Sequence, residues 1–167
     1  YVGLTPGHPC SYRRFMDDEL FSHINIKETN VPLGSAPDLQ AETQRYDAMI
    51  EQAGGIDILL LGLGQNGHIG FNEPDRSFSY GTQVVTLTKN TIKANRRFFG
   101  SENDVPRQAI SLGIGGIMKA RQIVLIAYGI SKAQAVRDMI KGPVDPMCPS
   151  SILQLHPDFI LVGDEEA

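Results

Sequence analysis

The apolar positions of the chain follow two different periodicities. Between residues 39 and 53 they recur every three or four positions, which is typical of one face of an α-helix. Asp38 can cap the start of this helix, and Gly54 and Gly55 can end it. Residues 56–61 are apolar except for Asp57, and such a short apolar run is typical of a buried strand in a parallel sheet. The pattern therefore predicts a helix followed directly by a buried strand.

The same two patterns recur along the rest of the chain. Strands are predicted over 82–87, 123–127 and 159–162. Helices are predicted over 9–24 with Ser11 as its cap, over 91–99, over 112–120, from Ser131 to about 140, and over 149–156. Because strands alternate with helices, we expect an α/β fold: a mainly parallel sheet with helices on both faces, three-layered and Rossmann-like. Ligands in such sheets bind beyond the carboxyl ends of the strands, so the loops after residues 61 and 127 are where chemistry is expected.

Composition favours one domain. The 167 residues, 41% of them hydrophobic, are enough for one sizeable core, and there is no repeat or low-complexity tract. The first residue is Tyr1 rather than Met, and it opens directly on apolar residues 2–4. We therefore expect a single α/β domain over residues 1–167 that is truncated at its N-terminus.

Several classes of protein are disfavoured by the same sequence. The longest apolar runs fall far short of the roughly 18 residues that a membrane span requires. Fifteen Lys and Arg against 19 Asp and Glu give a formal charge of −4, and no basic run marks a nucleic-acid partner. Cys10 and Cys148 have no metal-ligand spacing, so reduced cytosolic thiols are the default. We expect a cytoplasmic protein without a membrane or nucleic-acid partner.

The loop after the strand at 56–61 carries most of the chemistry-bearing residues. Residues 62–74 read Gly-Leu-Gly-Gln-Asn-Gly-His-Ile-Gly-Phe-Asn-Glu-Pro, and glycines such as Gly67 let the backbone approach a ligand closely. An imidazole just beyond a buried strand, with a carboxylate near enough to orient it, suits general acid/base catalysis. His68 and Glu73 fit that description, with the amide Asn66 beside them. A structural histidine and a solvated acid are the simpler alternative. Metal binding is disfavoured, since one His and one Glu supply only two ligands.

This loop resembles the signature of the glucosamine-6-phosphate deaminase (isomerase) family. The resemblance is closest to the shorter, non-allosteric bacterial type with its N-terminal part missing. It extends over essentially the whole chain. Further matching segments lie at 1–4, 8–9, 11–12, 15–16, 94–99, 105–106, 109–110, 129–135 and 153–157.

The resemblance implies roles for individual residues. His68 matches the histidine that opens the pyranose ring, and Glu73 matches the acid that supports it. Arg97 and Lys132 match cations that hold the substrate's phosphate and polar groups, although both could equally be ordinary surface residues. Asn66 stands where many members carry Asp; an amide orients an imidazole by hydrogen bonding but holds no negative charge.

The implied reaction converts glucosamine 6-phosphate and water into fructose 6-phosphate and ammonia, a hydrolase or isomerase activity in amino-sugar catabolism. No cofactor is expected, because acid/base groups suffice. The family's enolisation base would precede Tyr1, so residues 1–167 alone are expected to be inactive. The partner is a small sugar phosphate, and homo-oligomerisation stays open. The alternatives are a 6-phosphogluconolactonase-like hydrolase, which lacks the acid at Glu73, and a non-catalytic sugar-phosphate sensor, which has no need of His68 with Glu73. Gln83 and Val85 occupy the positions of two effector-binding cations in allosteric members, which predicts unregulated kinetics.

Overall fold

The computed structural model describes all residues from 1 to 167, and the chain divides into two compact units. The first unit contains residues 1–46 and 84–110, and the second contains residues 47–83 and 111–167. The predicted single domain and its truncation stay predictions. No helix combines the length and apolar character that crossing a membrane requires. The predicted cytoplasmic location stays a prediction.

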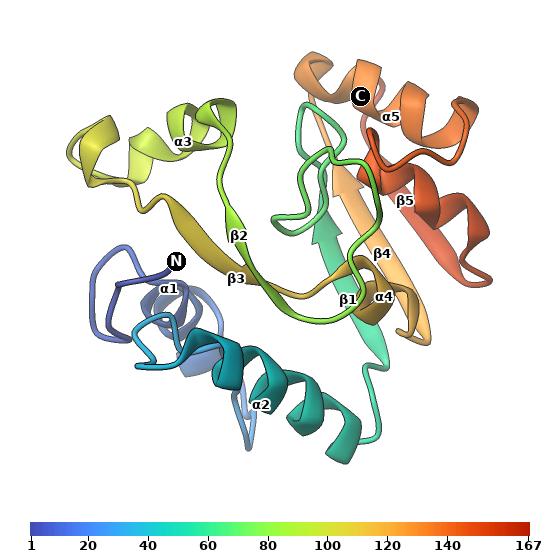
Figure 1. The fold of residues 1–167 in the computed structure, drawn as a ribbon. Helices are drawn as coiled ribbons and strands as arrows, with labels where there is room; N and C mark the ends of the chain where they lie inside the picture. Colours follow the sequence, from blue (N-terminus) through green and yellow to red (C-terminus); the bar gives the residue numbers. More distant parts are fainter. The chain divides into compact units, whose positions relative to one another are not determined.

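A parallel three-stranded sheet forms the centre of the second unit. Its strands are β1 (Ile58–Gly62), β4 (Gln122–Ala127) and β5 (Phe159–Gly163), in the order β1-β4-β5. Both neighbouring pairs are parallel, with Leu61 opposite Leu125 between β1 and β4. Figure 1 shows the three arrows side by side and running the same way. The predicted α/β fold with a mainly parallel sheet is confirmed.

One face of this sheet carries the core of the unit. Helix α4 (Ile114–Met118), helix α5 (Ala133–Lys141) and the 3-10 helix η5 (Pro149–Leu155) supply side chains to it. The buried members of this cluster are Leu61, Leu63, Ile69, Ile114, Ile117, Ala120, Ile123, Leu125, Ala127, Ala135, Met139 and Leu153. Because side chains alternate along a strand, residues of odd number in β4 and β5 face this core.

The opposite face of the sheet is exposed, whereas the sequence predicts helices on both faces. The side chains on this face are aliphatic, and the described residues place no layer over them; they include Ile58, Leu60, Ile126, Ile160 and Val162. An apolar run can fill both faces of a strand, but each face is buried only where another element packs on it.

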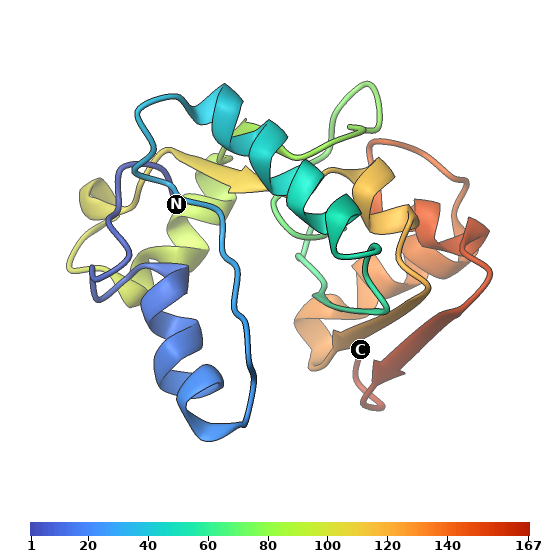
Figure 2. The ribbon, with the colours of Figure 1, turned by 90° about the horizontal axis from the view of Figure 1, so that it is seen from below.

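The first unit is built mainly from short helices. They are α1 (Tyr12–Glu19), α3 (Lys89–Asn95) and the 3-10 helices η1 (Phe21–His23), η2 (Arg96–Phe98) and η3 (Glu102–Asp104). A two-stranded sheet joins β2 (Gln83–Thr86) to β3 (Gln108–Ser111). Helix α2 (Leu39–Gln52) and this small sheet each contain residues of both units. Figure 2 shows α2 as a regular, uninterrupted helix.

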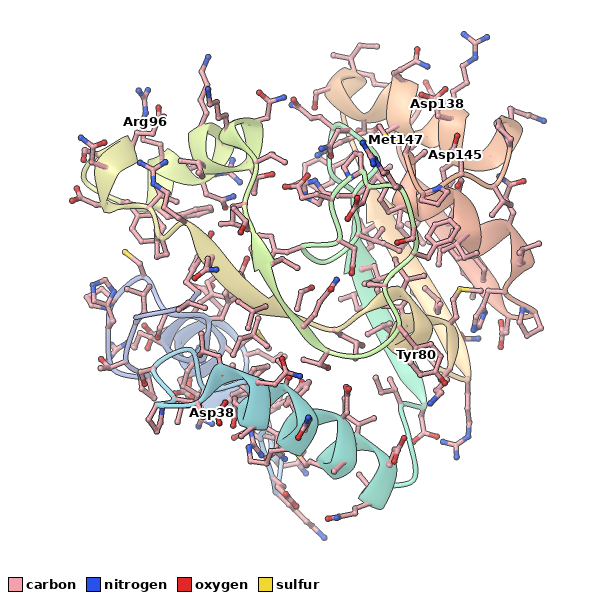
Figure 3. All side chains as sticks on the ribbon, in the orientation of Figure 1. Asp38, Tyr80, Arg96, Asp138, Asp145 and Met147 are labelled. Atoms are coloured by element: carbon pink, nitrogen blue, oxygen red, sulfur yellow. The ribbon has the colours of Figure 1, made fainter.

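The best-capped helix of the sequence is confirmed. Asp38, labelled at the start of α2 in Figure 3, accepts a hydrogen bond from the main-chain N–H of Ala41 at 2.9 Å. Gly54 and Gly55, which follow the helix, have φ angles of +86° and +91°. A left-handed conformation of this kind ends a helix, and glycine adopts it without a steric penalty.

Other predicted boundaries are wrong. Ser11 caps α1 as predicted, but that helix ends at Glu19, because Leu20 leaves the helical region at φ −137° and only a single 3-10 turn follows. Ser131 does not cap the next predicted helix: it lies inside the 3-10 turn η4 (Ile130–Lys132), and α5 begins at Ala133. The sequence analysis also missed β3, since four residues give too short a pattern to read.

Candidate active site

The loop that begins at the carboxyl end of β1 folds back on itself. The N–H of Gly64 donates to the carbonyl of His68 at 2.8 Å, and the N–H of Gly67 donates to the carbonyl of Gly64 at 3.0 Å. Gly67 has a φ of +81°, a conformation that favours glycine. These contacts turn the chain so that residues 66, 68 and 73 can meet.

The structure brings together three predicted site residues of this loop. The Asn66 side chain donates through Nδ2 to Oε2 of Glu73 at 2.8 Å. The Oδ1 atom of Asn66 lies 2.6 Å from Nδ1 of His68, and Glu73 Oε2 lies 3.4 Å from the same nitrogen. The side chains of His68 and Glu73 are 21% and 10% exposed, so the pair is half-buried but still reachable from solvent.

This arrangement fixes where the proton of a neutral His68 lies. An ionised carboxylate only accepts hydrogen bonds, so Glu73 turns the NH₂ group of Asn66 toward itself and the amide oxygen toward the imidazole. Two acceptor atoms would repel each other at the 2.6 Å that separates this oxygen from Nδ1, so the ring nitrogen donates and the proton of His68 lies on Nδ1. The other ring nitrogen, Nε2, then carries a lone pair that can accept a proton from a ligand.

Gly64 makes room for the imidazole ring. A Cβ atom built on Gly64 would overlap the Nδ1, Cε1 and Cγ atoms of His68. The ring therefore lies flat against a stretch of backbone that only glycine can supply. This role of Gly64 was not predicted, and its only signal in the sequence is a glycine four residues before the histidine.

Lys132 reaches the same loop from the next strand. It lies in η4, just after β4, and its Nζ atom donates to the carbonyl of Leu63 at 2.6 Å. Because β1 and β4 are parallel neighbours, their carboxyl ends meet at one edge of the sheet, and a lysine after β4 can contact the loop after β1. This contact places Lys132 beside the loop after β1, and its role in substrate binding stays a prediction.

Gly67 packs against the segment that leads into η5. The carbonyl of Gly67 accepts a hydrogen bond from the N–H of Ser150 at 2.9 Å. A Cβ at position 67 would come within 2.8 Å of the Cys148 sulfur. Asp145 and Met147, labelled in Figure 3, belong to the turn just before η5, where the N–H of Cys148 donates to the carbonyl of Asp145. Gly67 therefore allows a close approach between the loop and this turn.

Arg97 belongs to the first unit, whereas the other predicted site residues belong to the second. Its guanidinium carbon lies 4.7 Å from the centre of the Phe98 ring, a cation–π contact. It also lines a pocket of about 380 Å³ with aromatic and polar neighbours that include Tyr12, Phe15 and Asn95. The role of Arg97 in substrate binding stays a prediction.

A second histidine shows what a structural imidazole looks like in the same unit. His156 is 8% exposed, its Nε2 atom lies 2.9 Å from the carbonyl of Ala120, and its Nδ1 atom accepts from the N–H of Asp158 at 3.2 Å. Both of its ring nitrogens are paired with backbone. His68, by contrast, is held through Nδ1 by side chains of its own loop.

No group of three His, Cys, Asp or Glu side chains is placed to hold a metal ion. The loop after β1 instead holds one imidazole, that of His68, which Asn66 and Glu73 contact. A parallel sheet with such an imidazole beyond the carboxyl end of one strand, and a lysine beyond the next, defines a Rossmann-like α/β protein. The chain belongs to the glucosamine-6-phosphate isomerases/6-phosphogluconolactonase family, which it matches over residues 4–160.

Individual relatives agree with this assignment. The chain is 54% identical, over 169 aligned residues, to a glucosamine-6-phosphate deaminase of Thermoanaerobacter pseudethanolicus, covering 100% of this chain and 67% of the relative. It is 52% identical to a glucosamine-6-phosphate deaminase of Clostridium perfringens, covering 100% of this chain and 70% of the relative. A solved monomeric glucosamine-6-phosphate deaminase superposes with a TM-score of 0.97 at 44% identity, over 99% of this chain and 70% of that structure.

Proposed function

We propose that the protein deaminates glucosamine 6-phosphate, giving fructose 6-phosphate and ammonia in amino-sugar catabolism. The observation that carries the proposal is the contact of His68 with Asn66 and Glu73, because it prepares one ring nitrogen for proton transfer. Relatives that carry this activity in their names match the chain over its full length.

His68 acts on the closed sugar ring. Ring opening requires a proton to leave the anomeric hydroxyl and another to reach the ring oxygen. Nε2 of His68 takes the first proton, which makes the imidazole a cation, and then returns a proton to the ring oxygen. The open-chain aldehyde that results makes the C2 proton acidic enough for the isomerisation that follows.

Glu73 supports the cation that exists between these two proton transfers. Its Oε2 atom lies 3.4 Å from Nδ1 of His68, and the exposed fraction of its side chain is only 10%, so water screens the attraction weakly. Asn66 holds the imidazole in the orientation that presents Nε2 to the sugar.

Gly67, Lys132 and Arg97 bind the substrate in this proposal. Lys132 contacts the loop through Leu63 and brings a positive charge to the edge of the sheet. Gly67 has no side chain, so its main chain can approach the sugar closely. Arg97 supplies a planar group with several N–H donors, which suits a phosphate.

A substrate comparison tests the proposal. The intact protein is assayed for ammonia release from glucosamine 6-phosphate and, separately, for hydrolysis of 6-phosphogluconolactone, because the family contains both activities. We expect ammonia release at a turnover on the order of 1 to 10³ per second, typical of enzymes, and no lactone hydrolysis above the spontaneous rate. Lactone hydrolysis without ammonia release would contradict the proposal.

A further inference from the structure

A buried amide lies in the sequence between His68 and the carboxylate that supports its imidazole. Asn72 is 5% exposed, and its side chain forms hydrogen bonds on every side. Its Nδ2 atom donates to the carbonyl of Ile69 at 3.0 Å and to the carbonyl of Leu112 at 2.8 Å. An asparagine can make two donor contacts through its NH₂ group, and both are used here.

The acceptor side of the same amide is also occupied. Oδ1 of Asn72 accepts from Oγ of Ser79 at 2.7 Å and from Nε2 of Gln83 at 3.3 Å. Ser79 in turn accepts from the N–H of Ile114, the first residue of α4, at 3.0 Å. The amide therefore joins the loop to two other segments of the unit, residues 79–83 and 112–114.

The position of these contacts relates them to the proposed proton transfer. Ile69 directly follows His68, and Asn72 directly precedes Glu73. The carbonyl of Ile69 accepts from both the side-chain Nδ2 and the main-chain N–H of Asn72, the latter at 3.1 Å. The Asn72 side chain thus holds the backbone turn from Ile69 to Asn72, which separates His68 from Glu73 in the sequence. Its second hydrogen bond, to Leu112, fixes this turn to the rest of the unit.

We propose that Asn72 is a positioning residue for the reaction, setting the separation of His68 and Glu73 without touching the substrate. The kinetic test of this role rests on the proposed function, because it measures turnover of glucosamine 6-phosphate. Misplacing a reacting group by about 1 Å can cost roughly 100-fold in rate, so a residue that fixes a 3.4 Å separation has a measurable kinetic effect.

The test uses Asn72→Asp in the intact protein, with Ser79→Ala as a milder second variant. Asp cannot donate to the carbonyls of Ile69 and Leu112, so both contacts are lost while the size of the side chain is kept. We expect kcat for glucosamine 6-phosphate to fall about 100-fold with KM within about threefold. Ser79→Ala removes the hydrogen bond that Ser79 donates to Oδ1 of Asn72, together with the one that it accepts from the N–H of Ile114, and leaves both donor contacts of Asn72 in place. We expect it to lower kcat several-fold.

A second readout does not depend on turnover. Nitrogen NMR of protein labelled with ¹⁵N-histidine reports which ring nitrogen of His68 carries the proton, with His68→Asn used for assignment. We expect the Nδ1–H form in the unsubstituted protein and a mixture of the two forms in Asn72→Asp. If the unsubstituted protein releases no ammonia, the proposed function fails, whereas the NMR comparison still decides whether Asn72 positions the imidazole.

Gln154→Ala is the matched control. The Gln154 amide also donates to two carbonyls, those of Met139 and Gly142, at 2.8 and 3.0 Å, and both of these acceptors lie outside the loop. We expect its kcat and its His68 spectrum to be unchanged. Unchanged kcat in Asn72→Asp would overturn the proposal, as would losses in all three variants that track thermal stability alone. If Asn72→Asp does not fold, kcat and the His68 spectrum are measured for Ser79→Ala instead. A Ser79→Ala protein in which both are unchanged would overturn the proposal.

Discussion

Asn66 donates its side-chain N–H to Glu73 at 2.8 Å, and this contact determines which atom of the amide faces His68. The amide oxygen lies 2.6 Å from Nδ1 of the ring, so the carboxylate acts on the imidazole both directly and through the amide. In the proposed mechanism an asparagine can serve at this position, because it supplies an oriented acceptor while the negative charge comes from Glu73.

Replacing Asn66 tests this relationship. Asn66→Ala removes the acceptor that holds the proton on Nδ1, and we expect kcat to fall between about 10- and 100-fold because fewer molecules present a basic Nε2. Asn66→Asp keeps an oxygen toward the ring, and we expect it to retain kcat within about threefold. Steady-state kinetics of both variants at neutral pH make the comparison. Equal losses in the two variants would show that the amide N–H to Glu73 matters and that the acceptor does not.

Gly64 offers a steric test of the imidazole's position. A Cβ on Gly64 would overlap the His68 ring, so Gly64→Ala is expected to displace the ring and lower kcat about 100-fold while the protein stays folded. Gly62→Ala is the matched control, because a Cβ there meets no atom within 4 Å. Kinetics and circular dichroism of both variants check the prediction, and a Gly64→Ala enzyme with unchanged kcat would contradict the assigned ring position.

Sequence patterns predicted the local parts of the fold and missed those set by packing. Helix α2 has its own cap at Asp38 and its own stop at Gly54, so its boundaries are visible in the sequence. The break after Glu19 has no such marker, since apolar residues continue to Ile24 at helical spacing. Ile58 and Leu60 lie on the exposed face of the parallel sheet. Whether such residues are buried depends on which elements pack over that face, and a run of apolar residues does not indicate this.

An ion pair between the buried carboxylate of Glu42 and the half-exposed Arg45, near the start of α2, gives a test by pH. Glu42 is 6% exposed, accepts from Leu33 N–H at 2.7 Å and pairs with Arg45 through two contacts of 2.7 Å. The hydrogen bonds from Arg45 lower the pKa of Glu42 below its usual value of 4.5, although burial acts in the opposite direction. A carboxyl group with a lowered pKa in the folded protein stabilises it above the unfolded pKa, and this stabilisation is lost as the pH falls through the folded value.

We therefore expect Glu42→Gln to lower the free energy of unfolding by about 1–2 kcal/mol at pH 7, and by progressively less as the pH falls below about 4. Urea titrations at several pH values measure this difference. Glu51→Gln on the same helix is the control, because the Glu51 side chain is 74% exposed and its nearest contact to Lys119 is 3.8 Å; we expect no measurable effect. A Glu42→Gln difference that stays constant down to pH 3 would contradict the assigned pKa direction.

The kinetics of the intact enzyme give a fourth test. Gln83 and Val85 carry no charge where allosteric members of the family place two cations, and Gln83 instead donates to Asn72 at 3.3 Å. Phosphate binding relies on charge-assisted donors, and allosteric coupling requires a ligand that binds one state better. We expect hyperbolic substrate curves that N-acetylglucosamine 6-phosphate does not change. Sigmoidal curves that become hyperbolic with that compound would show an effector site elsewhere.

The candidate site was predictable as far as it is local in sequence. One loop contains Asn66, His68 and Glu73, so the residue types and their spacing in the sequence predicted that the three side chains meet. The Lys132 contact with Leu63 depends on the pairing of β1 with β4, which brings together residues far apart in the chain. Asn72 was missed for a different reason: an asparagine inside a glycine-rich loop is common, and only its burial and its four contacts single it out.

The rate of ammonia release from glucosamine 6-phosphate by His68→Asn tests the central claim most directly. Asn keeps a polar side chain of similar reach but cannot transfer protons, so we expect kcat to fall by a factor of about 10² to 10⁴ with KM and thermal stability nearly unchanged. His23→Asn, a change at an exposed histidine whose Nε2 lies 2.8 Å from the carbonyl of Asp18, is expected to leave kcat unchanged. A His68→Asn enzyme that releases ammonia at the rate of the unsubstituted protein would contradict the role of His68 in proton transfer.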